Sequence, residues 1–165
     1  MEPFIAFPKS LEISIADQSL LVYEGASKLR SYAISSALLG LGEIKNSYQT
    51  PRGRHKIRAK IGASVPVNTV FVGRRPSGEI WNPELAMAHP DRDWILTRIL
   101  WLSGLERGLN RLGEVDTMQR YVYIHGSPDT VPMGIPGSKG CIRMRNSDII
   151  ELFDLVPIGT ELKIQ

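Results

Sequence analysis

Apolar and polar residues alternate in short runs through the first third of the chain. Leu11–Ile15 alternates with period two, and Leu20–Tyr23 and Arg30–Ile34 follow after turns at residues 16–18 and 24–26. Such alternation places successive side chains on opposite faces of a sheet. The pattern therefore predicts three strands joined by tight turns in an antiparallel meander.

The middle of the chain carries two kinds of pattern. A turn at Thr50–Gly53 leads into a predicted strand at His55–Ala59, and Thr69–Gly73 has the composition of another strand. From Trp94 to Leu102 the apolar residues recur at helical spacing, until glycines break the pattern. We predict a helix there that covers the sheet. A lid or wall over a functional site is the alternative.

The last quarter of the chain returns to strand-like segments. Arg120–Ile124 is rich in aromatic and β-branched residues, and a long loop with several prolines and glycines follows at residues 127–140. Asn146–Asp148 is suited to cap a helix at Ile149–Leu155. We expect Glu161–Ile164 to form an edge strand.

Together these elements predict a mainly β fold. We expect a single domain over residues 1–165, with a β-sandwich or barrel-like sheet, two helices and a helical insertion or lid at about residues 81–120. A chain of 165 residues with 42% hydrophobic content can bury a sizeable core. It has no apolar run of roughly 18 residues or more, so no membrane span is predicted.

The charge and the first residues bear on partners and location. The net charge is +3 and the pI about 9.1. Without an aromatic–basic motif, this mild balance suits a small acidic substrate and argues against a nucleic-acid partner. Residues 1–8 lack a basic segment, a continuous apolar core and a small-residue cleavage site, so they do not resemble a secretory signal. We expect a cytoplasmic protein, or a periplasmic one if a leader was removed.

One cysteine and three histidines limit the possible chemistry. The lone cysteine, Cys141, excludes an intrachain disulfide and a zinc site built on several thiolates. There is no His-Glu-x-x-His motif, and we expect neither a metal nor another cofactor. A lone cysteine is usually a small buried hydrophobe, so its neighbours must decide its role. His55 and His89 have neighbours typical of the surface, and we expect both to lie there.

The neighbourhood of Cys141 predicts more than a buried hydrophobe. His125 ends a predicted strand, and Cys141 follows the glycine-punctuated loop after it. A thiol needs a base nearby to act as a nucleophile at neutral pH, and histidine is the usual partner. Gly140 would allow close backbone approach to a substrate, beside N–H groups that could form an oxyanion hole. Tyr121 and Tyr123 alternate on one face of the strand, as core or as pocket wall.

The sequence lacks the motifs of two classes of serine acyl-transfer enzyme. No serine has lysine at the third following position, and Gly-x-Ser-x-Gly does not occur. Any acyl transfer by this chain is therefore thiol chemistry.

These residues also resemble a known family. His125-Gly126 followed by Ser138-Lys139-Gly140-Cys141-Ile142-Arg143 is similar to the signature of the L,D-transpeptidase (YkuD-like) family. Thr50-Pro51-x-Gly53 resembles the family's upstream turn, and residues 146–148 and 159–164 resemble its closing helix and strand. The resemblance covers roughly residues 11–165 and is least at 81–120. Lys139 departs from the family pattern, which usually has histidine at that position.

The resemblance implies a role for each matched residue. Cys141 would be the nucleophile and His125 the base, with the carbonyl of Gly126 orienting the imidazole. Gly140 and Cys141 would offer backbone N–H groups to the oxyanion. Arg143 would brace the loop or bind a substrate carboxylate, and an ammonium on Lys139 would favour the thiolate. The remaining expected substrate contacts are Ser138 and Tyr123.

The resemblance further implies the substrate, a peptidoglycan stem tetrapeptide. The thiol would attack the carbonyl on the L-centre of the diamino acid, and the terminal D-alanine would leave. Transfer to water would make the protein an L,D-carboxypeptidase of muropeptide recycling, which the missing leader favours. Transfer to an amine would form 3-3 cross-links, and a non-catalytic wall-binding domain is the alternative of another class. A carbapenem would acylate Cys141 in either enzyme.

Overall fold

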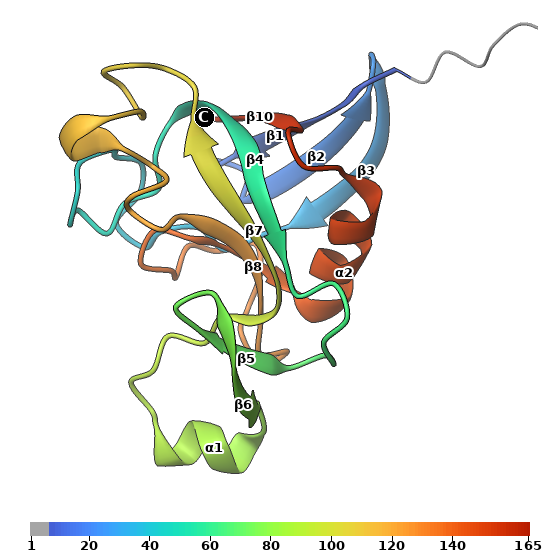
Figure 1. The fold of residues 1–165 in the computed structure, drawn as a ribbon, viewed down its shortest axis with the longest axis vertical. Helices are drawn as coiled ribbons and strands as arrows, with labels where there is room; N and C mark the ends of the chain where they lie inside the picture. The colour runs from blue at the N-terminus through green and yellow to red at the C-terminus, as the bar shows by residue number, and fades with distance from the viewer. Residues whose placement is uncertain (1–6) are drawn as a thin grey trace, which may run out of the picture.

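The computed structural model describes residues 7–165 and shows one curled sheet with helices beside it (Figure 1). The mainly β prediction is confirmed. Its strands are β1 (Lys9–Ser14), β2 (Ser19–Glu24), β3 (Ser27–Ala33), β4 (Gly53–Ile61), β5 (Thr69–Val72), β6 (Arg75–Ile80), β7 (Leu96–Gly104), β8 (Tyr123–Ser127), β9 (Ile142–Arg145) and β10 (Glu161–Ile164). Its helices are α1 (Pro83–Ala88), the short 3₁₀ helix η1 (Gly113–Val115) and α2 (Asn146–Leu155).

The sheet has the strand order β3-β2-β1-β10-β4-β7-β5-β6, with β8 beside β7 and β9 beside β8. The predicted meander is confirmed, since β1, β2 and β3 pair antiparallel in chain order. The predicted edge strand is wrong, because β10 lies between β1 and β4. Its Leu162 and Ile164 are buried there in the main core. Local sequence does not distinguish an edge from a centre when only alternate residues are apolar.

The predicted helix at residues 94–102 is also wrong, because most of that segment forms the central strand β7. Leu100 and Leu102 of β7 enter the main core, while Ile99 and Trp101 pack on the opposite face. A strand covered on both faces has a nearly continuous apolar run, which resembles a buried helix in periodicity. Within residues 81–120 the helical parts are only α1 and η1.

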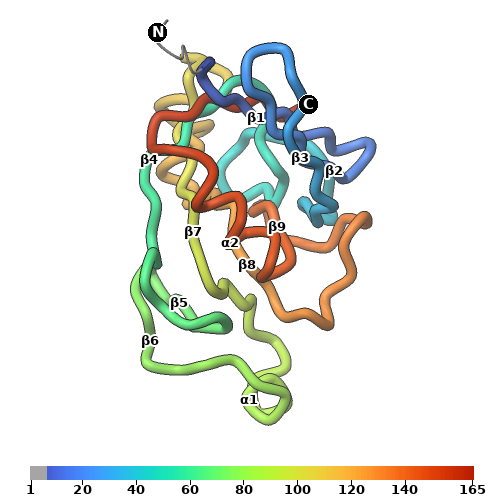
Figure 2. The backbone as a smooth tube through the Cα atoms, turned by 90° about the vertical axis from the view of Figure 1, so that its right-hand side faces the viewer, coloured from blue at the N-terminus to red at the C-terminus, as the bar shows by residue number. Residues whose placement is uncertain are grey.

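Helix α2 lies against β7, β8 and β9 and covers the core side of the sheet (Figure 2). Ile149, Leu152 and Phe153 are its buried apolar contacts. The helix begins without the predicted side-chain cap. Asn146 instead accepts a hydrogen bond from Thr97 Oγ1 at 2.6 Å and donates to Asn68 Oδ1 at 2.9 Å. Its side chain therefore ties the helix start to the sheet.

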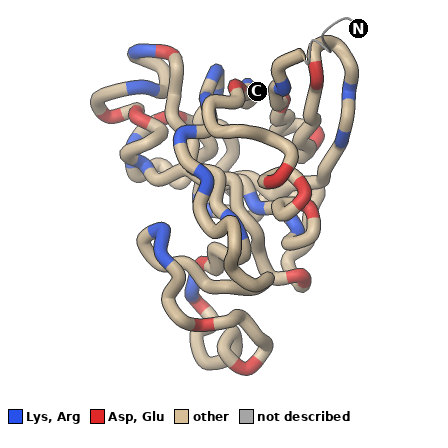
Figure 3. The backbone as a smooth tube through the Cα atoms, turned by 45° about the vertical axis from the view of Figure 1, so that its right-hand side comes forward, with Lys and Arg blue, Asp and Glu red and all other residues tan. Residues whose placement is uncertain are grey.

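The β5–β6 hairpin and α1 extend from one end of the main sheet (Figure 1). Arg74 and Arg75 make the tip of this hairpin basic (Figure 3). Among residues 7–165, no helix is both long and apolar enough for a membrane crossing. The sequence expectation about a signal segment falls on residues 1–8, of which 1–6 lie outside the described residues.

Candidate active site

Strands β8 and β9 lie side by side in parallel and carry candidate residues on one face. Their register pairs Ile124 with Ile142 and His125 with Arg143. The two isoleucines are fully buried in the main core. Because side chains alternate along a strand, His125 and Arg143 project from the opposite face, as does Cys141 just before β9. The fold thus brings together residues that are distant in the sequence.

The Cys141 thiol is partly exposed and contacts two backbone groups. The N–H of Tyr123 donates to Sγ at 3.3 Å, and Sγ donates to the carbonyl of Tyr121 at 3.5 Å. Burial raises the pKa of the thiol to about 12, although the Tyr123 N–H bond and the charges of Arg143 and Arg120 act in the opposite direction. The resting thiol is therefore protonated at neutral pH.

His125 is fully buried, and its imidazole makes one hydrogen bond to the described residues. Its Nδ1 lies 2.7 Å from the carbonyl oxygen of Gly126, which makes Nδ1 the protonated nitrogen of the neutral ring. Burial lowers the pKa of the imidazole, so the ring is neutral at pH 7. Among the described residues Nε2 has no hydrogen-bond partner. This nitrogen is therefore free to accept a proton.

Close packing explains why a glycine follows this histidine. A Cβ at Gly126 would lie 2.6 Å from both Asn146 Oδ1 and the carbonyl oxygen of Leu96. Real Cβ atoms do not approach oxygen that closely, so a side chain here would displace β8 or α2. The carbonyl that orients His125 consequently depends on glycine.

The loop before Cys141 is fixed by short polar contacts. Ser138 is buried, and its hydroxyl donates to the carbonyl of Cys141 and accepts from the N–H of Gly140 at 3.2 Å. Thr50 Oγ1 donates to the carbonyl of Gly140 at 2.9 Å. Ser138 therefore braces the loop, while its expected contact with substrate has no support in its inward orientation. The Gly140 N–H is already engaged, and the Cys141 N–H is the backbone donor left to consider for an oxyanion.

Arg143 connects the loop before Cys141 to the segment before β7. It donates to Asp93 Oδ1 at 2.8 Å and to the carbonyl of Gly137 at 3.1 Å. Of the two roles expected for Arg143, the observed contacts match loop bracing. Asp93 was not singled out from the sequence, because its importance comes from a contact between residues 50 positions apart.

A cavity of about 530 Å³ opens in front of the thiol. Polar and aromatic side chains form much of its wall around Cys141: Arg74, Asp93, Arg120, Tyr121, Tyr123 and Lys139. Tyr121, 53% exposed, and the buried Tyr123 both line the cavity, and Tyr123 also belongs to the smaller hydrophobic core. Lys139 lines the cavity and its side chain is exposed.

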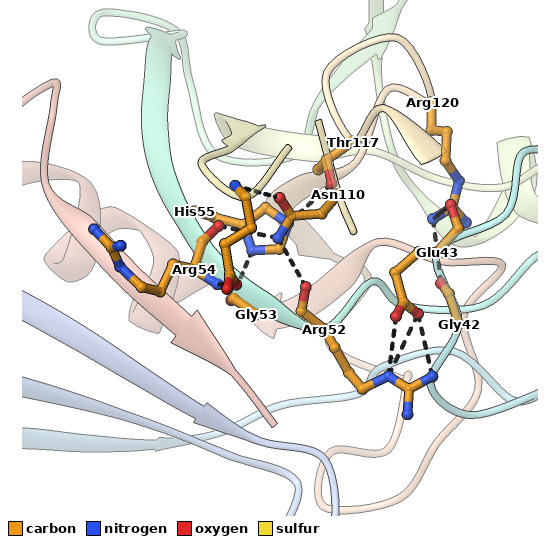
Figure 4. Close-up of polar contacts among 10 residues, drawn as sticks. Gly42, Glu43, Arg52, Gly53, Arg54, His55, Asn110, Thr117 and Arg120 are labelled. Atoms are coloured by element: carbon orange, nitrogen blue, oxygen red, sulfur yellow. Dashed lines mark hydrogen bonds and ion pairs between the residues drawn. The ribbon is translucent and has the colours of Figure 1, made fainter. Parts of the chain in front are cut away.

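Arg120 is another positively charged residue of the cavity wall, and it was not predicted from the sequence. Its guanidinium donates to the carbonyls of Gly42 and Glu43, both at 3.2 Å (Figure 4). It also donates to Ser47 Oγ at 3.3 Å and to the Gln49 carbonyl at 2.7 Å. Both terminal nitrogens are thus committed to the loop that borders the cavity. A loop arginine has no periodicity to identify it, so the sequence offers no signal for this role.

The expectation that His55 lies at the surface is wrong. His55 is fully buried, with Nδ1 3.0 Å from the Gly53 carbonyl and Nε2 2.9 Å from Thr117 Oγ1 (Figure 4). Burial lowers its pKa to about 4. It alternates with the exposed Arg54 and Lys56 along β4, which is why its neighbours suggested exposure. His89 is exposed, as expected.

The described part of the chain contains no cluster of three or more His, Cys, Asp or Glu side chains able to hold a metal ion. Near Cys141 the site offers a thiol, an imidazole and backbone N–H groups. These groups suit nucleophilic attack on an acyl carbon.

Comparison with known proteins agrees with this architecture. The family model of the YkuD L,D-transpeptidase catalytic domain matches residues 8–164. The putative L,D-transpeptidase YkuD of Bacillus licheniformis is 46% identical over 157 residues, which cover 95% of this chain and 66% of that protein. The probable L,D-transpeptidase ErfK/SrfK of Salmonella typhimurium is 49% identical over 45 residues, 27% of this chain and 15% of that protein. This chain thus spans less than two thirds of these relatives.

Solved structures share the fold at low sequence identity. An L,D-transpeptidase from Mycobacterium smegmatis superposes with a TM-score of 0.57 at 21% identity, covering 97% of this chain and 59% of that one. The LD transpeptidase LdtMt1 in complex with imipenem superposes with a TM-score of 0.56 at 18% identity, covering 95% and 58%. The match over residues 8–164 decides the classification: this chain belongs to the L,D-transpeptidase catalytic-domain family.

Proposed function

We propose that the protein is a cysteine acyl-transfer enzyme that cleaves the bond between the diamino acid and the terminal D-alanine of peptidoglycan tetrapeptides. The observation that carries this proposal is the state of His125. Its Nδ1 is fixed by the Gly126 carbonyl, on the face of β8 and β9 that carries Cys141. Its buried Nε2 has no hydrogen-bond partner among residues 7–165. A buried acceptor left unpaired costs roughly 1–3 kcal/mol, a cost that a general base would justify.

The reaction would begin from a neutral pair. Cys141 Sγ attacks the carbonyl carbon on the L-centre of the diamino acid while its proton passes to Nε2 of His125. For this transfer the thiol leaves the Tyr121 carbonyl that it contacts at rest. The carbonyl oxygen becomes an oxyanion, to which the Cys141 N–H donates. The C–N bond then breaks, Nε2–H protonates the leaving amine, and D-alanine departs from a thioester.

The second half of the reaction decides the class of enzyme. Water deprotonated by His125 would attack the thioester, releasing the shortened peptide and restoring the thiol. Two cavity cations support a donor peptide with free carboxylates, since neither Arg74 nor Lys139 has an ion-pair partner among residues 7–165. We favour hydrolysis of soluble tetrapeptide, in the cytoplasm, over transfer to a second stem peptide that would form a 3-3 cross-link.

Mass spectrometry of purified protein incubated with tetrapeptide tests this proposal. Tripeptide with free D-alanine supports hydrolysis, whereas mainly dimeric peptide identifies a cross-linking enzyme. Cys141→Ser, which keeps the size but lacks an available thiolate, should lower turnover by several orders of magnitude. A variant that keeps more than a few per cent of wild-type turnover would remove Cys141 from the mechanism. Cell fractionation decides the location separately.

A carbapenem gives a second, independent measure of the nucleophile. Because LdtMt1 has been solved in complex with imipenem, we expect a carbapenem to add one covalent mass to this protein. The adduct should map to the peptide containing Cys141 and be absent from Cys141→Ser. An adduct on another residue would contradict the assignment.

A further inference from the structure

Arg74 occupies an unusual backbone position at the hairpin tip. It is the second residue of the Gly73-Arg74 turn between β5 and β6, and both residues have positive φ, 56° and 64°. Such turns favour glycine or asparagine at the second position, because a larger side chain is strained there. A residue that breaks a local rule is often retained for what its side chain does.

The side chain of Arg74 is held rigidly over the cavity wall. Its Cζ lies 4.6 Å from the ring centroid of Trp101 and 4.7 Å from that of Tyr121, and Nη1 donates to the hydroxyl of Tyr123 at 3.0 Å. The Tyr123 contact and the two rings keep the guanidinium charged and fix its plane. Tyr123 also donates its backbone N–H to Cys141 Sγ, so one tyrosine connects Arg74 to the thiol.

No carboxylate among residues 7–165 forms an ion pair with Arg74. The acid on the cavity wall, Asp93, already pairs with Arg143 at 2.8 Å. The remaining cavity arginine, Arg120, has both terminal nitrogens bonded to loop oxygens. Arg74 therefore presents a fixed cation with free N–H donors toward the cavity, the arrangement that binds a carboxylate through two hydrogen bonds.

We propose that Arg74 selects donor peptides whose diamino acid carries a second carboxylate at the end of its side chain. This inference rests on the proposed function. The thiol contacts the backbone N–H of Tyr123 and Arg74 contacts its hydroxyl, so the two groups lie at opposite ends of one tyrosine on the cavity wall. With its L-centre carbonyl at Sγ, such a residue would place its far carboxylate at Arg74. Lys139, two residues before Cys141 in the chain and also on the cavity wall, would be left for the terminal carboxylate of D-alanine.

Two tetrapeptides that differ in one group test the assignment. Both contain diaminopimelic acid, one with the side-chain carboxylate free and the other with it amidated. We expect wild-type kcat/KM to favour the free acid by roughly tenfold or more, mainly through KM. In Arg74→Gln the ratio between the two peptides should fall close to one, and Arg74→Lys should restore it in part. Arg75→Gln, an exposed neighbour that does not line the cavity, is the matched control and should keep the wild-type ratio.

The readouts separate this inference from the proposed function. A ratio that survives in Arg74→Gln, or an equal loss on both peptides, overturns the selective role and leaves Arg74 as a support for Trp101 and Tyr123. Calorimetric titration of both peptides into Cys141→Ala measures the preference without turnover. If the titration shows a preference for the free acid but the wild-type protein does not turn over either peptide, the proposed reaction is refuted and the role of Arg74 is not. If neither assay shows a preference for the free acid, the role of Arg74 is refuted.

Discussion

His55 and His125 are two buried histidines whose hydrogen bonding can be compared directly. Both are fully buried, and both place Nδ1 on the carbonyl of a glycine, Gly53 in one case and Gly126 in the other. They differ at Nε2, which contacts Thr117 Oγ1 in His55 and has no partner among the described residues in His125. Burial alone therefore does not identify a catalytic histidine. The two histidines differ instead in whether Nε2 is satisfied by the described residues, and a buried polar atom without a partner calls for an explanation.

The largest expected effect comes from His125→Gln. Removing the base should lower kcat/KM by roughly 10²–10⁴-fold, since a positioned general base contributes about that much. Stability should change little, because the variant loses one carbonyl contact and also removes an unpaired buried nitrogen. Steady-state kinetics and urea unfolding measure the two effects. A strong loss of stability with activity retained per folded molecule would reverse the roles of the two histidines.

The second effect is a pH dependence of stability centred on His55. Its folded pKa of about 4 is below the ordinary 6.5, so protonation favours the unfolded chain as pH falls from 6.5 to 4. The stabilisation is complete above pH 6.5, and its loss toward pH 4 is worth about 3 kcal/mol. Urea unfolding across this range should show the slope. His125 adds a slope of the same sign, because its pKa is also lowered by burial.

His55→Gln should have a smaller effect on stability, and it isolates the contribution of the His55 hydrogen bonds. Losing the contacts to Gly53 and Thr117 should destabilise the fold by about 1–3 kcal/mol and reduce the slope between pH 6.5 and 4. The kcat of the folded variant should stay near that of wild type, because His55 does not line the cavity. An unchanged slope would assign the pH dependence to other groups.

The smallest expected effect concerns Lys139. It tests whether a nearby positive charge, in addition to the Nε2 left unpaired by the described residues, distinguishes the surroundings of His125 from those of His55. Lys139→Glu should lower kcat/KM by roughly five- to tenfold, because a carboxylate would repel the donor's terminal carboxylate. Lys139→His should be well tolerated. Equal activity of the two variants would show that this exposed side chain has no electrostatic part in the reaction.

The candidate residues near Cys141 were predictable because their signals are local. A histidine after a predicted strand, a glycine-punctuated loop and a cysteine lie within 17 consecutive positions, His125 to Cys141, although the structure places His125 in the middle of β8. The meander of β1–β3 was predictable for the same reason, since alternation and turns occur together. Both depend on the order of residues over short distances.

What the sequence did not reveal depends on contacts between distant segments. Strand β7 resembled a helix because β4 and β8 cover its edges while apolar side chains fill both its faces. Arg74 and Asp93 acquire their importance only when the hairpin and the segment before β7 approach Cys141. His55 looked exposed because alternate residues of β4 are charged. None of these relations has a period or a motif along the chain.

The position of β10 has a consequence for how the chain folds. This last strand inserts between β1 and β4, pairing parallel with the first strand of the described chain. Until it arrives, β1 and β4 each present an unpaired edge, although the β1–β3 meander can form from local contacts alone. Closing a loop that nearly spans the chain is slow, and open edges invite pairing between molecules. During synthesis, the interval before β10 emerges is therefore when this protein is most exposed to aggregation.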